Sequence, residues 1–308
     1  MKQVWIEHGR VSVRECPAPR GKVLLKLRLG GICNTDLELL RGYYGFRGRP
    51  GHEFVAEKAA TGQRVVGEIN LACGKCAWCR RHLGRHCPHR AVLGIVKHPG
   101  AFAEYFTLPE ANLLPVPACV SDEHAVFTEP VAAACEILEQ VPEIAQGEVA
   151  VLGDGKLGLL IAQVLAVSGA KVDLYGRHSA KVRIAQKAGV RGRVGARLPA
   201  RRYPFVVEAS GSAQGFAQAA SMVRPRGVLV LKSTVHERLS IDTAPLVVDE
   251  ITLIGSRCGR FQPALDLIRK NVLNLDPMLD AEYPLERAPQ AFAHAARPGA
   301  LKVLLRPA

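Results

Sequence analysis

The stretch EVAVLGDGKLGLLIAQVLAVSG occupies residues 148–169. It begins with an apolar run that predicts a strand over 148–153, and it ends in a helical pattern over 156–169. The turn between them has the spacing G-x-G-x-x-G, which permits a tight turn, a close approach of the backbone to a pyrophosphate, and helix-on-strand packing. This context favours a dinucleotide-binding turn over a purely structural one. The expected cofactor contacts are Gly153, Asp154, Gly155, Lys156, Leu157 and Gly158.

Strand and helix patterns alternate on both sides of this stretch. They are a helix over 123–141, a strand over 170–176, a helix over 178–189, a strand over 204–210, a helix over 212–223, and strands over 227–233 and 251–256. Such alternation with short loops is typical of βαβ units in a parallel sheet. The sequence therefore predicts an α/β, Rossmann-type, doubly wound domain over residues 126–261.

The end of the second predicted strand bears on the choice of cofactor. A site that selects NAD places Asp or Glu there to bind the ribose 2′-hydroxyl, but this strand ends in Gly176, Arg177 and His178. Arg177 suits bidentate pairing with a phosphate, and Lys181 adds charge one helical turn later. No Asp or Glu occurs between Leu174 and Val207. We expect NADP(H) in preference to NAD(H), with an NAD(H)-preferring enzyme as the alternative.

The first part of the chain predicts a β-rich domain. GKVLLKLRLG over 21–30 predicts a strand that ends at a Gly-Gly turn, and EFVAEKAA and QRVVGEI add short apolar runs. After residue 262 the sequence predicts helices and a last strand, LKVLLRP. We expect this tail to return to the first domain, so that one domain comprises 1–125 plus 262–308.

Three residues of the β-rich part form a candidate open metal site. Cys33, His52 and Glu53 offer a thiolate, an imidazole and a carboxylate, and Glu129 is a fourth candidate. A catalytic zinc takes about three protein ligands and keeps one position for water or substrate. Each residue alone is more often structural; their combination with the dinucleotide turn favours a catalytic zinc.

Four cysteines within 73–87 form a second candidate metal site: Cys73, Cys76, Cys79 and Cys87. Four thiolates close a tetrahedral zinc completely, which indicates a structural ion. A disulfide knot and an iron–sulfur cluster are the alternatives. We expect the thiols to stay reduced in the cytoplasm, because the N-terminus carries no secretory signal pattern and no run approaches the ~18 apolar residues of a membrane span.

The charge of the chain raises a different function class. The 308 residues carry 41 Lys and Arg against 28 Asp and Glu, a net charge of +13. Together with Arg80, Arg81 and Arg85 in the cysteine-rich stretch, this suggests a zinc-containing nucleic-acid-binding protein. Such proteins usually present a basic face with stacking aromatics, whereas this stretch offers only Trp78. We therefore expect no nucleic-acid partner and no membrane partner.

Taken in order, the motifs resemble those of the zinc-dependent medium-chain dehydrogenase/reductase superfamily, which includes the alcohol and sorbitol dehydrogenases. They are G-I-C-x-T-D at 31–36, G-H-E at 51–53, the four cysteines, E-P at 129–130, G-x-G-x-x-G at 153–158 and A-S-G at 209–211. The resemblance covers essentially the whole chain. It implies a GroES-like catalytic domain beside the Rossmann domain, two zinc ions per chain, and a homo-oligomer, either a dimer or a tetramer.

The resemblance also implies residue roles. Cys33 and His52 would bind the catalytic zinc, with Glu53 as a direct or exchangeable ligand and Glu129 as the glutamate used in the polyol and glucose dehydrogenase branches. Thr35 would pass the substrate proton, and Asp36 would orient His52. Ala209, Ser210 and Gly211 would lie beside the cofactor. Hydride would pass between NADP(H) and a small alcohol, polyol or sugar, or its carbonyl form.

The chain departs from the family pattern at two residues and in its length; the change at Glu38 alters the proton relay, and the shorter length bears on the substrate. Asn34 stands where Gly is commonest, and Glu38 replaces a histidine that many members carry. The chain is also shorter than most relatives, so no substrate is carried over from the family. A reductase that works without zinc, or a redox-inactive nucleotide sensor, is the alternative within the same fold, and the intact zinc-ligand pattern disfavours it.

Overall fold

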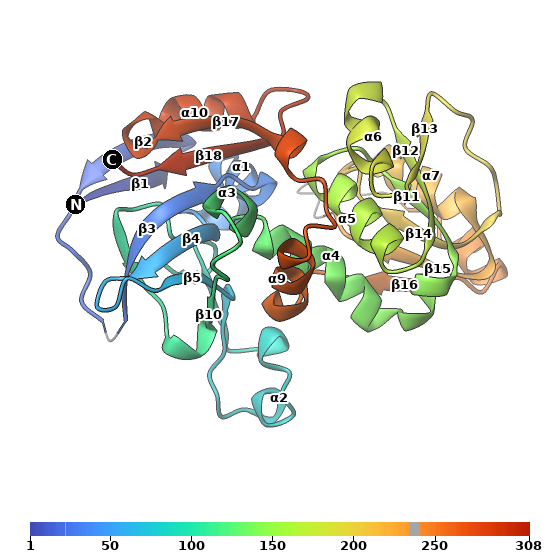
Figure 1. Cartoon of the computed structure of the whole chain (residues 1–308). Coiled ribbons are helices and arrows are strands. Elements are labelled where there is room, and N and C mark those ends of the chain that lie inside the picture. The colour runs from blue at the N-terminus through green and yellow to red at the C-terminus, as the bar shows by residue number, and fades with distance from the viewer. Residues whose placement is uncertain (22, 234–240) are drawn as a thin grey trace. The chain divides into compact units, whose positions relative to one another are not determined.

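The computed structural model describes residues 1–21, 23–233 and 241–308, which form two compact units. The first unit combines Met1–Glu129 with Leu279–Ala308, and the second is Pro130–Met278 (Figure 1). Residues 126–129 thus lie with the first unit and 262–278 with the second, unlike the boundaries predicted from sequence. One reason is the buried Gln163, whose Oε1 accepts the backbone N–H of Asn274 at 2.7 Å.

The second unit is built on a six-stranded parallel sheet with the order β13-β12-β11-β14-β15-β16. Its strands are β11 (Glu148–Leu152), β12 (Lys171–Gly176), β13 (Arg191–Val194), β14 (Tyr203–Glu208), β15 (Val223–Leu231) and β16 (Thr252–Gly255). The order reverses between β11 and β14, which is the switch point of a doubly wound fold, where nucleotides bind at the carboxyl ends of the strands. The predicted Rossmann-type sheet is confirmed.

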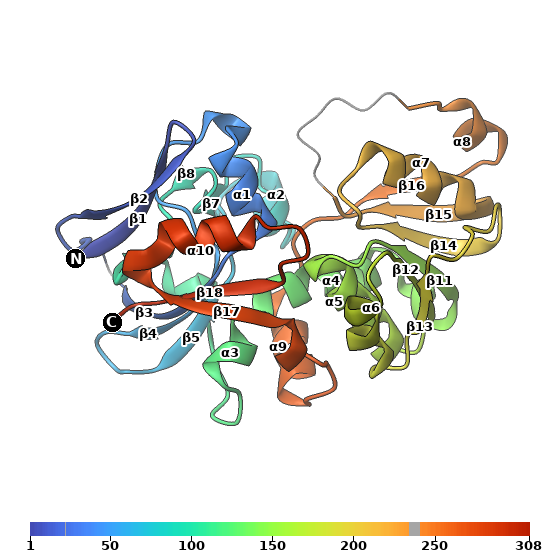
Figure 2. The same cartoon turned by 90° about the horizontal axis from the view of Figure 1, so that it is seen from above.

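Helices cover both faces of this sheet. Figure 2 shows α5 (Lys156–Val167) and α6 (Ser179–Gln186) on one face and α7 (Ala213–Met222) on the other. The unit also contains α8 (Ala244–Val248) and α9 (Phe261–Arg269). The helix expected over 123–141 is divided into α3 (Asp122–Ala125) and α4 (Thr128–Gln140). Pro130 lies in the first turn of α4, where its missing N–H costs no helical hydrogen bond.

The first unit is β-rich, as predicted. Its main sheet has seven strands in the order β10-β5-β4-β3-β18-β17, with β9 also paired to β3. They are β3 (Leu24–Gly31), β4 (Glu53–Lys58), β5 (Arg64–Gly67), β9 (Tyr105–Thr107), β10 (Leu113–Pro115), β17 (Leu279–Pro284) and β18 (Lys302–Arg306). Smaller sheets pair β1 (Lys2–Glu7) with β2 (Arg10–Glu15), and β6 (Asn70–Leu71) and β8 (Lys97–His98) with β7 (Ala91–Leu93). The sequence did not predict β17, which pairs in parallel with β18.

The C-terminal tail completes the core of the first unit. Helix α10 (Ala288–Ala295) buries Phe292, which lies edge-on to Phe102 with ring centroids 6.3 Å apart. The same core contains Val303 and Leu305 of β18, and Leu37 of helix α1 (Asn34–Leu40). The tail therefore supports the helix that begins directly after Cys33.

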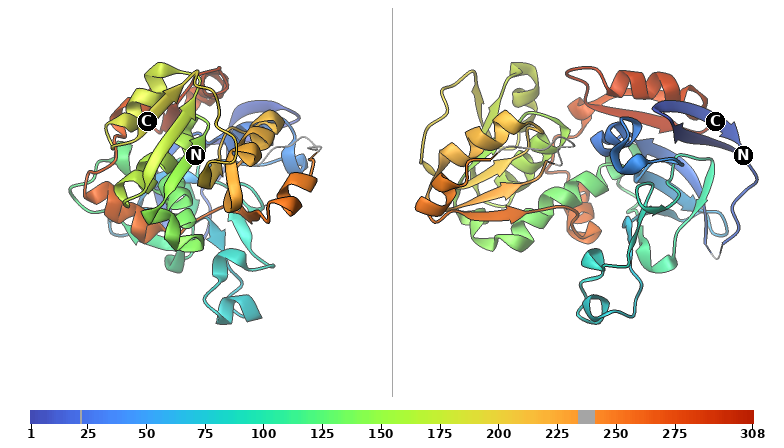
Figure 3. Two further views of the ribbon diagram at one scale, coloured as in Figure 1. Left: turned by 90° about the vertical axis from the view of Figure 1, so that its right-hand side faces the viewer. Right: turned by 180° about the vertical axis from the view of Figure 1, so that it is seen from behind.

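The cysteine-rich stretch forms a lobe of the first unit around the short helix α2 (Ala77–Arg80). The lobe stands away from the rest of its unit in both views of Figure 3.

Across the described ranges, no helix is long and apolar enough to cross a membrane.

Candidate active site

Cys33 lies between strand β3 and helix α1, where it forms the helix N-cap. Its backbone N–H donates to Asp36 Oδ2 at 2.9 Å, within the first turn of the helix. A carboxylate in the first turn also interacts favourably with the positive end of the helix dipole. This local arrangement fixes Cys33 just beyond the carboxyl end of β3. Its Sγ lies 3.7 Å from Thr35 Oγ1.

Asp36 also connects α1 to the G-H-E motif. Its buried carboxylate accepts the backbone N–H of Gly51 at 3.2 Å, and its Oδ1 lies 3.4 Å from His52 Nδ1. Gly51 has a φ of +101°, and a Cβ there would lie 2.4 Å from the Phe102 ring, so only glycine fits. Burial lowers the pKa of His52, but the charges of Asp36 and Cys33 outweigh burial and raise the pKa well above its usual value.

The fold brings the three predicted ligands together. One ligand atom each from Cys33, His52 and Glu53 lies within 4.8 Å of the other two. A thiolate, an imidazole and a carboxylate at this spacing suit zinc, and three ligands leave a coordination position open. Among the described residues, Glu129 is not part of this group, although its side chain is buried in the same unit. The donor set therefore fits a catalytic zinc.

Lys302 is a site residue that the sequence analysis missed. Its fully buried ammonium donates to Glu53 Oε2 and lies 5.6 Å from the centre of the Phe127 ring. Gly31 makes room for the pair, because a Cβ there would lie 2.7 Å from Glu53 Oε2 and 3.2 Å from Lys302 Cδ. The available signal was a lysine inside the apolar strand LKVLL, since a charge buried in a strand needs a partner.

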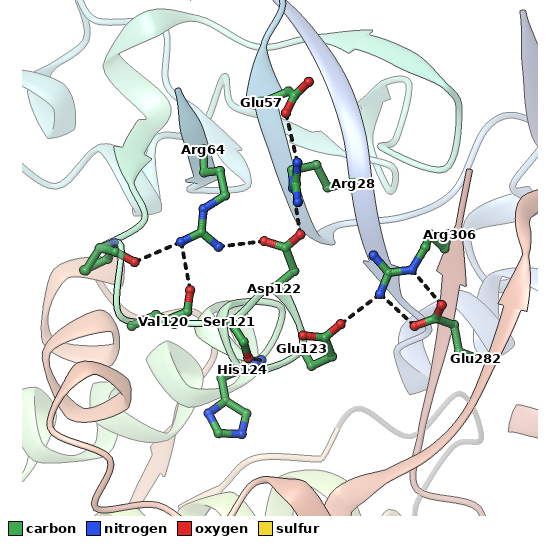
Figure 4. A network of polar contacts seen from close by, with 11 residues as sticks. Arg28, Glu57, Arg64, Val120, Ser121, Asp122, Glu123, His124, Glu282 and Arg306 are labelled. Atoms are coloured by element: carbon green, nitrogen blue, oxygen red, sulfur yellow. Dashed lines mark hydrogen bonds and ion pairs between the residues drawn. The ribbon is translucent and has the colours of Figure 1, made fainter. Parts of the chain in front are cut away.

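A polar network holds the chain that leads to Glu129. Asp122 accepts from Arg28 Nε at 2.7 Å and from an Arg64 nitrogen at 2.8 Å (Figure 4). Arg64 also donates to the carbonyl of Val120 at 2.9 Å. Because Arg28 lies on β3 and Arg64 on β5, the network fastens α3 and the loop before it to the main sheet.

The four cysteines of the lobe form the second metal group. Their sulfur atoms lie within 4.8 Å of one another. The separations are 3.5 Å for Cys76–Cys79, 3.7 Å for Cys76–Cys87 and 3.9 Å for Cys73–Cys79. Tetrahedral zinc with sulfurs at ~2.3 Å requires about 3.8 Å between them. Backbone N–H groups of Lys75 and Cys76 lower the pKa of Cys73 to about 6, which favours the thiolate. All nine cysteines of the chain are free thiols, so the lobe is not a disulfide knot.

The glycine-rich turn follows β11 directly, as predicted. A Cβ on Gly153 would lie 2.6 Å from the carbonyl oxygen of Ala209, and one on Gly158 would lie 2.1 Å from that of Gly153. A Cβ on Gly155, the N-cap of α5, would have no atom within 4 Å. Two glycines therefore permit close internal packing, while Gly155 leaves open space at a helix N-terminus, where a pyrophosphate binds favourably.

The A-S-G turn lies against this loop. Ser210 donates its backbone N–H and its hydroxyl to Glu208 Oε1 at 2.7 and 2.6 Å, and Gly211 donates its N–H to Ser233 Oγ at 2.9 Å. These bonds fix Ala209–Gly211 at the carboxyl end of β14, beside the switch point. Within its unit, the segment therefore lies beside the glycine-rich turn.

The end of β12 presents cations to solvent. Arg177 is exposed and Lys181 half-buried, and neither has a charged partner within the described ranges. Asp173, the carboxylate of the same strand, is fully buried and accepts from Arg191, Arg193 and Tyr203. It is therefore not available to a ribose. Leu157 and Lys156 begin α5 beside this end of the sheet.

Comparisons with known proteins agree with this arrangement. The alcohol dehydrogenase GroES-like domain matches residues 19–118, and the zinc-binding dehydrogenase domain matches residues 157–270. The sorbitol dehydrogenase of Halalkalibacterium halodurans is 28% identical, with 97% of this chain and 96% of the relative covered. The D-altritol 5-dehydrogenase of Agrobacterium fabrum is 30% identical, with 82% of each covered. A zinc-binding dehydrogenase of Sinorhizobium meliloti, solved with NADP bound, has 27% identity and a TM-score of 0.89, with 99% of both chains covered.

Both domain types, the motifs and the relatives agree. This chain belongs to the zinc-dependent medium-chain dehydrogenase/reductase superfamily, and it is an NAD(P)-dependent oxidoreductase of the alcohol dehydrogenase type.

Proposed function

We propose that this protein transfers hydride between NADP(H) and a small alcohol, polyol or sugar, or the corresponding carbonyl compound. The observation that supports the proposal most strongly is the convergence of Cys33, His52 and Glu53 within 4.8 Å, in a chain that also carries the dinucleotide turn. The polyol class is supported by relatives named sorbitol dehydrogenase and D-altritol 5-dehydrogenase.

The proposed roles are those that the family resemblance implies, and the geometry of the first unit supports them. Cys33 and His52 would hold the zinc, and Asp36, whose Oδ1 lies 3.4 Å from His52 Nδ1, would orient His52. Glu53 is a direct or exchangeable ligand, and Glu129 is the second candidate carboxylate. When bound, zinc supplies a Lewis acid that lowers the pKa of an alcohol hydroxyl. Thr35 would pass on the substrate hydroxyl proton, and the 3.7 Å between its Oγ1 and Cys33 Sγ supports this role.

The preference for NADP(H) is proposed from the end of β12. Gly176 offers no carboxylate, Asp173 is buried, and Arg177 and Lys181 offer positive charge. His178, which follows Arg177, is a further candidate cofactor contact. The NADP-bound relative of Sinorhizobium meliloti supports the same preference.

Three further properties are proposed with the activity. Each chain would carry a second, structural zinc on the four cysteines of the lobe. The chain would form a homo-oligomer, a dimer or tetramer, through the sheet edge at β16, where Leu253 is 47% exposed. It would act in the cytoplasm, where its nine thiols stay reduced.

A screen of NADP⁺ reduction across alcohols and polyols tests the activity, with zinc-replete protein. We expect turnover of at least one class and about two zinc ions per chain by metal analysis. Cys33→Ser should abolish turnover and remove about one zinc, whereas Cys119→Ser, a change at an exposed cysteine, should do neither. Activity and zinc content that survive Cys33→Ser unchanged would refute the open zinc site.

A further inference from the structure

The glycine-rich turn supplies a carboxylate where the end of β12 lacks one. A Cβ built on Gly176 would lie 2.7 Å from Asp154 Cβ and 2.8 Å from Asp154 Oδ2. The Asp154 side chain therefore fills the space that a side chain at position 176 would occupy. Position 176 is the strand-end position from which an acidic residue usually binds the ribose in this fold.

Hydrogen bonds hold this carboxylate in one orientation. Asp154 Oδ2 accepts the backbone N–H of Arg177 at 2.8 Å, the backbone N–H of His178 at 2.7 Å, and lies 3.0 Å from His178 Nδ1. Asp154 Oδ1 has no hydrogen-bond partner among the described residues, although the residue is only 7% exposed. Burial raises the pKa of Asp154, and the His178 and Arg177 hydrogen bonds outweigh it, so the net pKa is lowered.

The Asp154 carboxylate uses Oδ2 for its hydrogen bonds within the protein, so Oδ1 remains able to accept a hydrogen bond from a ligand. Asp154 Oδ1 is not among the fully buried atoms that lack a partner, so a ligand hydroxyl can donate to it in place of water. A ribose hydroxyl is such a donor, whereas a 2′-phosphate is an anion that a neighbouring carboxylate repels. Arg177 and Lys181 act in the opposite direction, because their charges attract the phosphate.

We propose that Asp154 is a specificity-determining residue that takes the place of the missing acid at the end of β12. Its free oxygen accepts a hydroxyl of the adenosine ribose, and its charge opposes a 2′-phosphate. The inference rests on the proposed dinucleotide site and refines its preference. Asp154 favours NAD(H) while Arg177 and Lys181 favour NADP(H), so the proposed preference for NADP(H) is small, within about tenfold.

Calorimetric titration with NAD⁺ and with NADP⁺, without substrate, tests this in the full-length, zinc-replete protein. We expect the two dissociation constants of the wild-type protein to lie within about tenfold of each other. Asp154→Asn keeps the size of the side chain and an oxygen that accepts from the backbone, but it removes the charge. We expect it to weaken NAD⁺ binding and tighten NADP⁺ binding, each by roughly tenfold.

Asp249→Asn is the matched control, since it removes one negative charge from the same unit at the opposite, amino end of the sheet. It should leave the ratio of the two constants unchanged. An unchanged ratio in Asp154→Asn, or equal changes in both constants, would overturn the inference and leave Asp154 as a residue that only shapes the turn. A wild-type ratio far above tenfold in favour of NADP⁺ would also overturn it. Failure of the wild-type protein to bind either dinucleotide would instead overturn the proposed cofactor site itself.

Discussion

Replacement of Lys302 by Met should destabilise the first unit strongly. Lys302 and Glu53 are each only 1% exposed, and their ion pair links β18 to β4 across 249 residues of sequence. Removal of one partner from a buried pair leaves an uncompensated charge and costs about 3–5 kcal/mol, a large part of a typical total of ~5–15 kcal/mol. Replacement of both partners by apolar residues of similar volume is often close to neutral.

The direction of the Lys302 pKa shift determines the pH range in which the ion pair contributes to stability. Burial lowers this pKa, but the Glu53 carboxylate, Cys33 and Glu129 together raise it above its usual 10.5. A lysine with a raised pKa in the folded state contributes its full stability below the unfolded-state pKa, and the contribution is lost as the pH rises through the folded-state pKa. Urea denaturation at pH 7 therefore measures Lys302 in its charged form.

Tryptophan fluorescence reports on the correct unit, because both tryptophans of the chain, Trp5 and Trp78, lie in the first unit. We expect Lys302→Met to lower the free energy of unfolding of chelator-treated protein by about 3–5 kcal/mol. The double variant Lys302→Met/Glu53→Met should lose much less than the sum of the single variants, with a coupling energy of at least about 2 kcal/mol. Zinc should reduce the loss in the single variant, because a cation beside Glu53 also neutralises the carboxylate.

The half-exposed pair Lys2–Glu286 of the same unit provides the control, and Lys2→Met should change the free energy of unfolding by less than about 1 kcal/mol. A loss below about 1 kcal/mol in Lys302→Met, or additive losses in the double variant, would refute the argument that this buried pair is a coupled stabilising contact.

Four other outcomes can be measured. Arg177→Ala should lower kcat/KM for NADP⁺ roughly tenfold and leave that for NAD⁺ nearly unchanged, since it removes only a phosphate partner; an unchanged ratio of the two would contradict the assignment. Asp122→Asn should cost about 1–2 kcal/mol in urea unfolding, because two arginines lose their ionic acceptor at 2.7 and 2.8 Å; a stability equal to wild type would show that the network is redundant. Chelation should expose five additional reactive thiols, Cys33 and the four of the lobe, and should make the 73–87 lobe sensitive to protease, whereas the lobe thiols and the lobe backbone remain protected if the lobe closes without metal. Leu253→Lys should reduce the mass measured by light scattering to that of a monomer, and an unchanged oligomer would place the interface elsewhere.

Local patterns were sufficient for the nucleotide-binding half of the fold. The β11–turn–α5 segment was predictable because its strand, glycine spacing and helix are contiguous, so neighbouring residues alone carry the signal. Strand β13 was missed, because Arg191–Val194 is short and basic and becomes a strand only by pairing with β12. The predicted domain boundaries also differed from the two units, since the segment 262–278 contacts the second unit through Asn274 and Gln163, which are 111 residues apart.

By itself, the sequence determined the superfamily, the two-part architecture and the candidate ligands Cys33, His52 and Glu53, because each motif lies within a few residues and its chemistry depends on residue type and spacing. Only the tertiary structure decided which groups surround those ligands. Lys302 reaches Glu53 from the other end of the chain, and Asp154 occupies the side-chain space beside Gly176. Both relationships arise from contacts between separate segments of the chain: a buried ion pair in the first case and a steric contact in the second, neither of which a local pattern connects.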